Sequence, residues 1–145
     1  MSGLPPIASV VPHSGRMLLL DEVVAFDGSR VVCRVRLRPG STFMEAGRVR
    51  AIVALEYMAQ AVAAFAGLRA RAAGEAVRVG FLLGTRELRL EVEGFQAGDE
   101  LVVEATHVWG DEELGSFDCA VRQAERQVAS ATLNVYQGRT EGLPE

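Results

Sequence analysis

Apolar and polar residues alternate along the first part of the chain in the manner of strands that have one buried face. Residues 17–26 are mostly apolar, and the turn-forming sequence Asp27-Gly28-Ser29 follows them. In residues 30–38 the apolar side chains occupy one face of the expected strand and arginines occupy the other. This pattern predicts two antiparallel strands that are joined in a hairpin.

A long alanine-rich segment without proline follows at residues 49–73. Alanine favours helix, and Gly74 is placed to end it. Within residues 51–68 only Glu56 and Gln60 interrupt a run of apolar or small side chains. A helix of this kind either spans a membrane or is buried in protein on nearly every side. We favour burial in protein, because two polar groups would cost a lone span several kcal/mol.

Strand-like runs separated by turn signals occupy the rest of the chain. They lie at residues 77–90, 100–109, 114–122 and 128–136, with turns at 94–99, 110–113 and 123–127. A hairpin, one long helix and an antiparallel meander make an α+β protein in which a single sheet wraps the helix. One curved sheet cannot cover every face of that helix, so we expect a second copy to cover the remainder.

Composition narrows the class of protein. The chain has 145 residues, 49% of them apolar and 23% charged. This is enough chain for one domain with a sizeable core, and we expect a single domain over residues 1–145. The net charge of −4 argues against nucleic acid as a partner.

Residue usage excludes several chemistries. All fifteen basic residues are arginine, which excludes Schiff-base chemistry on lysine. Cys33 and Cys119 are too few for a disulfide framework and lie in apolar alternating runs, so we expect free core thiols. The two histidines show no metal-ligand spacing, and we expect neither a metal nor a cofactor. The first twelve residues lack the features of a signal peptide, so we expect a cytoplasmic protein without a membrane segment.

Three motifs in order carry a resemblance to a known family. LEYMAQAVA (55–63), PHSGRMLLLDEV (12–23) and GFQAGDEL (94–101) resemble the helix, first-strand and turn motifs of the hotdog-fold β-hydroxyacyl-acyl carrier protein dehydratases. The resemblance covers roughly residues 11–137. FLLGTREL, GSFDCAVR and LNVYQG are similar to segments of the dehydratase-like proteins of aryl polyene biosynthesis.

The resemblance implies a hotdog fold, in which an antiparallel sheet wraps one long central helix. It also implies dimers or higher oligomers with active sites at the subunit interface, and a thioester substrate on acyl carrier protein or coenzyme A. Acyl carrier proteins are acidic, so docking needs a basic patch. The candidates are the arginines of one expected strand face, or those before the helix: Arg34, Arg36 and Arg38, or Arg48 and Arg50. The first group is equally compatible with a solvated strand face.

In these dehydratases a loop histidine faces an acidic residue on the helix. The acidic position corresponds to Glu56, and running the family pattern back without a gap puts Thr42 at the position of the histidine. Another base is therefore required, and His13 is the only imidazole on a loop that can reach a cleft. We expect Glu56 to act as acid, with a pKa raised by burial on an apolar helix, and His13 to act as base. The other histidine, His107, lies in an expected strand and is read as a core or surface imidazole.

Substrate-binding residues are expected around this pair. Gln60 lies one turn after Glu56 and on the same side, where it orients Glu56 or a water, or serves as a core amide bonded to backbone. Gly47 allows a close approach of substrate, or is part of a turn. Thr42 takes the place of the family histidine beside the substrate. An elongated apolar tunnel for the acyl chain is expected to be built by Phe43, Leu55, Ala59 and Phe81.

Three functions are compatible with these residues. The first is dehydration of a 3-hydroxyacyl thioester on a carrier protein. The second is a hotdog thioesterase, in which Glu56 activates a water and no histidine is needed. The third is a non-catalytic subunit that completes a heteromer with another hotdog protein, a reading supported by Thr42 at the histidine position.

Overall fold

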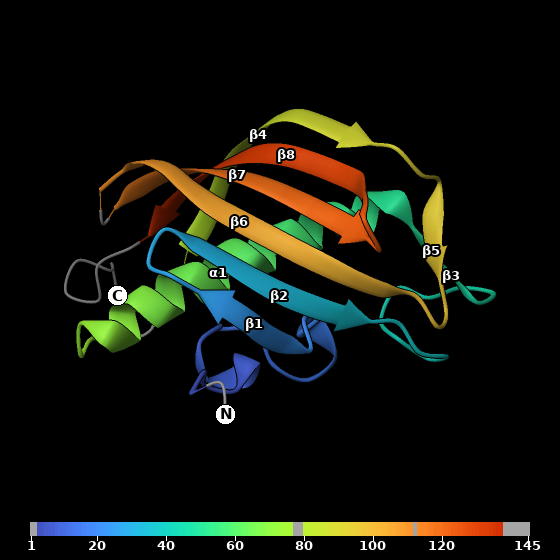
Figure 1. Cartoon of the computed structure of the whole chain (residues 1–145), viewed down its shortest axis with the longest axis horizontal. Coiled ribbons are helices and arrows are strands. Elements are labelled where there is room, and N and C mark those ends of the chain that lie inside the picture. Colours follow the sequence, from blue (N-terminus) through green and yellow to red (C-terminus); the bar gives the residue numbers. More distant parts are fainter. Residues whose placement is uncertain (1–2, 77–79, 112, 138–145) are drawn as a thin grey trace.

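A computed structural model describes residues 3–76, 80–111 and 113–137, the side chains of Phe81 and Gln137 excepted. One helix, α1 (Ala54–Ala72), lies against the concave face of a six-stranded antiparallel sheet (Figure 1). The spatial order of the strands is β1-β2-β6-β7-β8-β4. Their bounds are β1 Glu22–Phe26, β2 Arg30–Arg36, β4 Gly80–Leu90, β6 Glu100–Gly110, β7 Leu114–Gln123 and β8 Arg126–Gln137.

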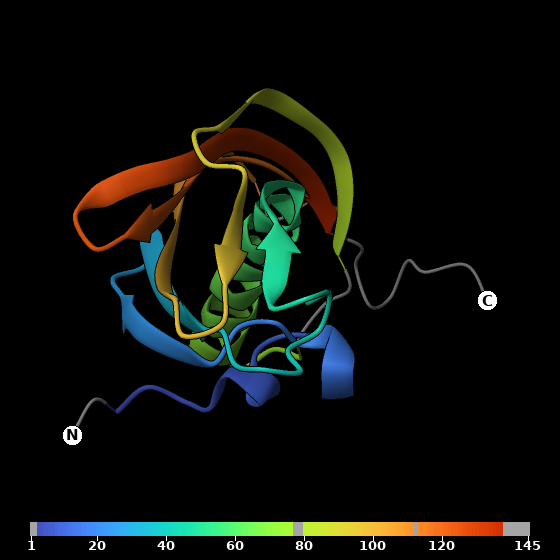
Figure 2. The ribbon, with the colours of Figure 1, turned by 90° about the vertical axis from the view of Figure 1, so that its right-hand side faces the viewer.

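Short elements complete the fold. Strands β3 (Arg48–Arg50) and β5 (Gly94–Gln96) pair with each other outside the main sheet. Single turns of 3-10 helix lie at η1 Ile7–Ser9, η2 Gly15–Met17 and η3 Ala51–Val53. Figure 2 shows the sheet curving over α1, with the blue N-terminal segment on the side that the sheet leaves open. This is the α+β arrangement expected from the pattern of the chain.

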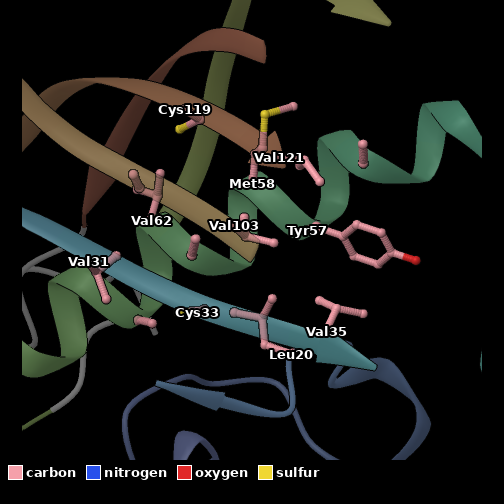
Figure 3. Packing of buried hydrophobic residues seen from close by; sticks show 14 of the residues in the cluster. Leu20, Val31, Cys33, Val35, Tyr57, Met58, Val62, Val103, Cys119 and Val121 are labelled. Atoms are coloured by element: carbon pink, nitrogen blue, oxygen red, sulfur yellow. The ribbon is translucent and has the colours of Figure 1, made fainter. Parts of the chain in front are cut away.

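The core lies between α1 and the inner face of the sheet (Figure 3). Tyr57, Met58 and Phe65 of the helix are at most 1% exposed. Ala51–Ala72 is long and apolar enough to cross a membrane by length and composition, yet most of it is buried inside the protein. The expectation of a helix buried in protein therefore agrees with its packing.

Both cysteines belong to this core. Cys33 and Cys119 are free and buried, as expected, and burial raises the pKa of each thiol to about 12. Neither thiol is a nucleophile at neutral pH, because the thiolate is the reactive form.

The start of the helix differs from the expectation. Residues 49–53 were expected to be helical, but α1 begins at Ala54. Val49 is fully buried in strand β3, where it pairs with Phe95 of β5 in a segment that was expected to be only a turn. Tertiary pairing overrides helix propensity here, because burial of Val49 and Phe95 outweighs the small preference of the local sequence.

The N-terminal segment packs directly on the helix. A Cβ added to Gly67 of α1 would lie 1.7 Å from the carbonyl oxygen of Val10, so only glycine permits this approach. Val10 is fully buried, and Ile7 and Val11 beside it are nearly so. The contact fixes the chain three residues before His13.

We expect Gly67→Ala to lower the free energy of unfolding by about 1–3 kcal/mol, because the added methyl group forces the backbone of Val10 away. The better helix propensity of alanine, about 1 kcal/mol, offsets only part of this. Urea unfolding measures the change. The control is Gly84→Ala, whose Cβ would meet no atom within 4 Å. Equal stability of the two variants would contradict a requirement for glycine at this contact.

Candidate active site

His13 and Glu56 come together from distant parts of the sequence. Glu56 lies in the first turn of α1, and His13 lies in the loop between η1 and η2. His13 Nε2 is 3.8 Å from Glu56 Oε1, a separation longer than a hydrogen bond. The two side chains are 27% and 41% exposed in the single chain. Glu56 is thus only partly buried in the single chain.

The side chain of Gln60 links α1 to the N-terminal segment by hydrogen bonds. Its side chain is fully buried. Its Nε2 donates to the carbonyl oxygen of Met17 at 2.7 Å, and its Oε1 accepts from the amide of Leu19 at 2.9 Å. Nε2 also lies within donating distance of Glu56 Oε1, at 3.2 Å. Gln60 therefore is a core amide bonded to backbone, one of its two expected roles. The other role, orientation of Glu56, stays a prediction.

The imidazole of His13 is only partly satisfied. Its Nδ1 is buried and has no hydrogen-bond partner among the described residues. A buried polar atom without a partner costs about 1–3 kcal/mol and calls for an explanation such as a catalytic role or a bound water. Within the described residues, no hydrogen bond to this nitrogen holds the ring in place.

A cavity of about 210 Å³ adjoins the pair. The helix contributes Ala59, Val62, Ala63 and Ala66, and the sheet contributes residues of β4 and β8. Apart from His13 and Glu56 its walls are apolar or glycine; the remaining residues are Pro12, Gly80, Leu82 and Val135. An apolar chain can lie in this cavity with its reacting end beside the two ionisable groups.

The other expected binding residues lie elsewhere in the single chain. Thr42 Oγ1 donates to the carbonyl oxygen of Arg16 at 2.6 Å. Phe43 is 50% exposed and lines a separate hollow of about 610 Å³ near the start of the helix. Gly47 has a φ of 77°, as in a turn, in the loop before β3. Their role in substrate binding stays a prediction.

Only part of the expected tunnel wall borders the cavity. Ala59 lines it, whereas Phe43 and Leu55 do not. The side chain of Phe81 lies outside the described part of the structure; its backbone pairs with Tyr136. Sequence reasoning missed Val62, Ala66 and Val135. The helical spacing from Ala59 pointed to Ala66, but Val135 depends on the pairing of β4 with β8.

His107 does not join the site. Its ring lies 5.8 Å from that of Phe65 and 5.1 Å from that of Phe117, measured between centroids. Burial, with the nearby charge of Arg69, lowers the pKa of His107 below its usual value of 6.5. The ring behaves as the structural imidazole that was expected. In the described part of the chain, no three His, Cys, Asp or Glu side chains converge as a metal site.

Comparison with known proteins finds close relatives of this architecture. The sequence model of a family described as ApeP dehydratase matches residues 5–143. The chain is similar to the dehydratase heterocomplex ApeI:P from Xenorhabdus doucetiae, with 29% identity over 95% of this chain and 94% of that chain, at a TM-score of 0.90. No curated protein matches in sequence.

More distant structures share the fold alone. A hypothetical thioesterase with coenzyme A from Streptococcus pneumoniae TIGR4 is 14% identical over 81% of this chain and 84% of that chain, at a TM-score of 0.61. The PaaI protein of E. coli is 13% identical over 79% of this chain and 80% of that chain, also at 0.61. These likenesses and the family match confirm the expected hotdog fold.

We expect Gln60→Met to lower the free energy of unfolding by about 1–3 kcal/mol, because it leaves the part-buried Leu19 amide and Met17 carbonyl without their partners. Thermal or urea unfolding measures the change. The matched control is Gln96→Met at an exposed position, which is expected to stay within about 0.5 kcal/mol of the parent. If Gln60→Met unfolds like the control, the side chain does not tie the loop to the helix.

Proposed function

Because the chain belongs to the ApeP-like family of dehydratases, we propose that it eliminates water from a 3-hydroxyacyl thioester and that His13 and Glu56 transfer the protons. The observation that supports this assignment is the approach of His13 Nε2 to Glu56 Oε1, 3.8 Å apart at the end of an apolar cavity. The elimination needs a base that reaches the proton on C2 and an acid that reaches the hydroxyl group on the adjacent C3.

The proposed cycle starts with His13 neutral and Glu56 protonated. His13 takes the proton from C2 of the thioester, and the electron pair of that C–H bond becomes the C2=C3 double bond. The C3–O bond breaks, its electron pair goes to the oxygen, and the oxygen takes the proton of Glu56 and leaves as water. The proton on His13 then passes to Glu56, directly after a small approach or through one water, and restores the pair.

Gln60 has a positioning role in this cycle. Its Nε2 lies 3.2 Å from the Glu56 oxygen that faces His13. A donor at this oxygen leaves the other oxygen of Glu56 without a protein partner in the described part of the chain. That second oxygen is the one we assign to carry the proton for the departing hydroxyl group.

We also propose that the chain works in an assembly with a second hotdog subunit, either its own copy or a different protein. The similar ApeI:P structure is a heterocomplex. β4 is an edge strand of the sheet, and Leu82 and Leu83 on it are exposed in the single chain. Thr42 at the position of the family histidine favours a second candidate function, in which this chain completes the site of a partner that carries that histidine. The distant thioesterase neighbours support only the fold and add nothing to hydrolysis as an alternative.

Arg48 and Arg50 are the better candidates for docking an acidic carrier protein. Arg34 and Arg36 of β2, and Arg38 just after it, are engaged by carboxylates of Glu22, Glu100 and Asp21, as expected of a solvated strand face. Within the described residues no ion pair engages Arg48 or Arg50. Both line the hollow of about 610 Å³, whose other lining residues include Ile52 and the carboxylates of Glu45 and Glu93.

We expect His13→Ala and Glu56→Gln each to lower turnover by roughly 10²–10⁴-fold, the usual contribution of a general acid or base. The double variant is expected to lose little more, because cooperating groups are not additive. The assay follows enoyl product from a 3-hydroxyacyl thioester, with Glu125→Gln in the exposed turn between β7 and β8 as control.

The same assay separates the two candidate functions. Near-normal turnover by His13→Ala would contradict its role as base. Activity that appears only after addition of a second hotdog subunit, and that survives His13→Ala, would favour the completing subunit over the self-sufficient enzyme.

We expect replacement of Arg48 and Arg50 by glutamate to raise KM for a carrier-bound substrate at least tenfold while kcat for a pantetheine thioester stays unchanged. Reversed charge at the docking surface slows encounter with an acidic partner. The control reverses the same number of charges at exposed Arg71 and Arg126. An equal effect of both double variants would contradict a specific docking role.

A further inference from the structure

The imidazole of His13 is held in place mainly by the backbone on either side of it. Its Nδ1 has no hydrogen-bond partner within the described residues, and its Nε2 is 3.8 Å from Glu56 Oε1, too far for a hydrogen bond. On the N-terminal side the backbone is fixed at Val10 by its contact with Gly67. The position of the ring therefore also depends on what fixes the chain after His13.

A closed turn of the backbone follows His13 directly. The amide of Met17 donates to the carbonyl oxygen of Ser14 at 3.2 Å, a bond that closes the 3-10 turn η2. Ser14 is joined to His13 by one peptide bond. Any displacement of this turn therefore moves the imidazole relative to the helix.

Thr42 holds η2 from outside the helix. Its Oγ1 donates to the carbonyl oxygen of Arg16 at 2.6 Å. The next carbonyl oxygen, that of Met17, accepts from Nε2 of Gln60 at 2.7 Å. Two successive carbonyl groups of one turn are thus bound by side chains from two separate parts of the chain. Together these bonds restrain both the place and the rotation of the turn, whereas either bond alone leaves it free to pivot.

The loop that carries Thr42 has a strained backbone. The amide of Met44 donates to the carbonyl oxygen of Ser41 at 3.0 Å, so Thr42 and Phe43 are the central residues of a four-residue turn. Phe43 has a φ of 69°, although glycine is the usual residue where the third position of such a turn has a positive φ. A bulky residue keeps this conformation only where its surroundings hold it. The bond from Thr42 to Arg16 is one such restraint.

We propose that Thr42 is a positioning residue, whose hydroxyl group fixes η2 and thereby sets the approach of His13 to Glu56. Its bearing on catalysis rests on the proposed function, in which His13 is the base. Thr42 acts through the backbone of residues 13–16 and does not need to touch the substrate. A misplacement of about 1 Å in a reacting group can lower a rate about 100-fold, so a restraint on this backbone matters for turnover.

The kinetic test removes the hydroxyl group and keeps the shape of the side chain. We expect Thr42→Val to lower kcat for a 3-hydroxyacyl pantetheine thioester about tenfold, with little change in KM, because the base is misplaced while the binding surface stays. Thr42→Ser keeps the hydroxyl group and is expected to restore kcat to near the parent value. The matched control is Thr132→Val, which removes a hydroxyl group that bonds to Asp118 at an exposed position of the sheet. It is expected to leave kcat unchanged.

A spectroscopic measurement tests the position of His13 without any turnover. The chain has only two histidines, so NMR of this chain, isotope-labelled, gives one imidazole signal for His13 and one for His107. The spectrum of His13→Ala assigns them. We expect Thr42→Val to shift the His13 signal, because the ring moves relative to Glu56. The signal of His107, which stacks on Phe65, is expected to stay in place.

The two measurements separate the failure of this inference from failure of the proposed function. A His13 signal that shifts in Thr42→Val and returns in Thr42→Ser supports the positioning role even if the parent protein dehydrates no thioester. An unshifted His13 signal in Thr42→Val, or a serine variant that behaves like the valine variant, overturns it. In an active protein, unchanged kcat of Thr42→Val also overturns it. Thr42→Ala lacks the same hydroxyl group and replaces the valine variant if that variant does not fold.

Discussion

The N-terminal segment, which has little secondary structure, covers the side of α1 that the sheet leaves open. This packing determines the geometry of the candidate site. The sheet curves over α1 and leaves one side open, and residues 7–19 lie across that side. Two contacts hold them there: the backbone of Val10 against Gly67, and the buried amide of Gln60 between Met17 and Leu19. His13 lies between these two anchors, so its distance from Glu56 is fixed by backbone packing rather than by a direct bond.

The order of the elements was predictable because each has a strong period. The alternation over residues 30–38 predicted β2, and the apolar alanine-rich segment predicted α1. In the second half of the chain, turn signals between apolar runs predicted the strands. The start of the helix and strand β5 were not predictable, since Val49 and Phe95 show their pairing only once the chain has folded. Single short strands of three residues carry no period from which a sequence can reveal them.

Some residues of the candidate site were likewise predictable from the sequence, and others were not. Glu56 and Gln60 were identified because they alone interrupt the apolar or small side chains of residues 51–68, and His13 because the chain has only two histidines. Helical spacing reaches as far as Ala66. Val135 joins Ala66 in the cavity wall only through the register of β8 with its neighbours, which the sequence does not encode locally. The positions of Thr42 and Phe43 outside the cavity depend on a loop, where spacing along the chain says little about place.

The alkylation rates of the two buried thiols report how often the sheet opens. Because burial raises the pKa of each thiol to about 12, almost no thiolate is present at pH 7 while the fold stays closed. Alkylation then proceeds at the frequency with which the surrounding strands separate. Cys33 lies on β2, next to the sheet margin at β1, and Cys119 lies on β7 near its middle. The labelling rate of Cys33 therefore measures opening near the edge of the sheet, and that of Cys119 measures opening near its middle. Both rates come from one molecule without an added probe.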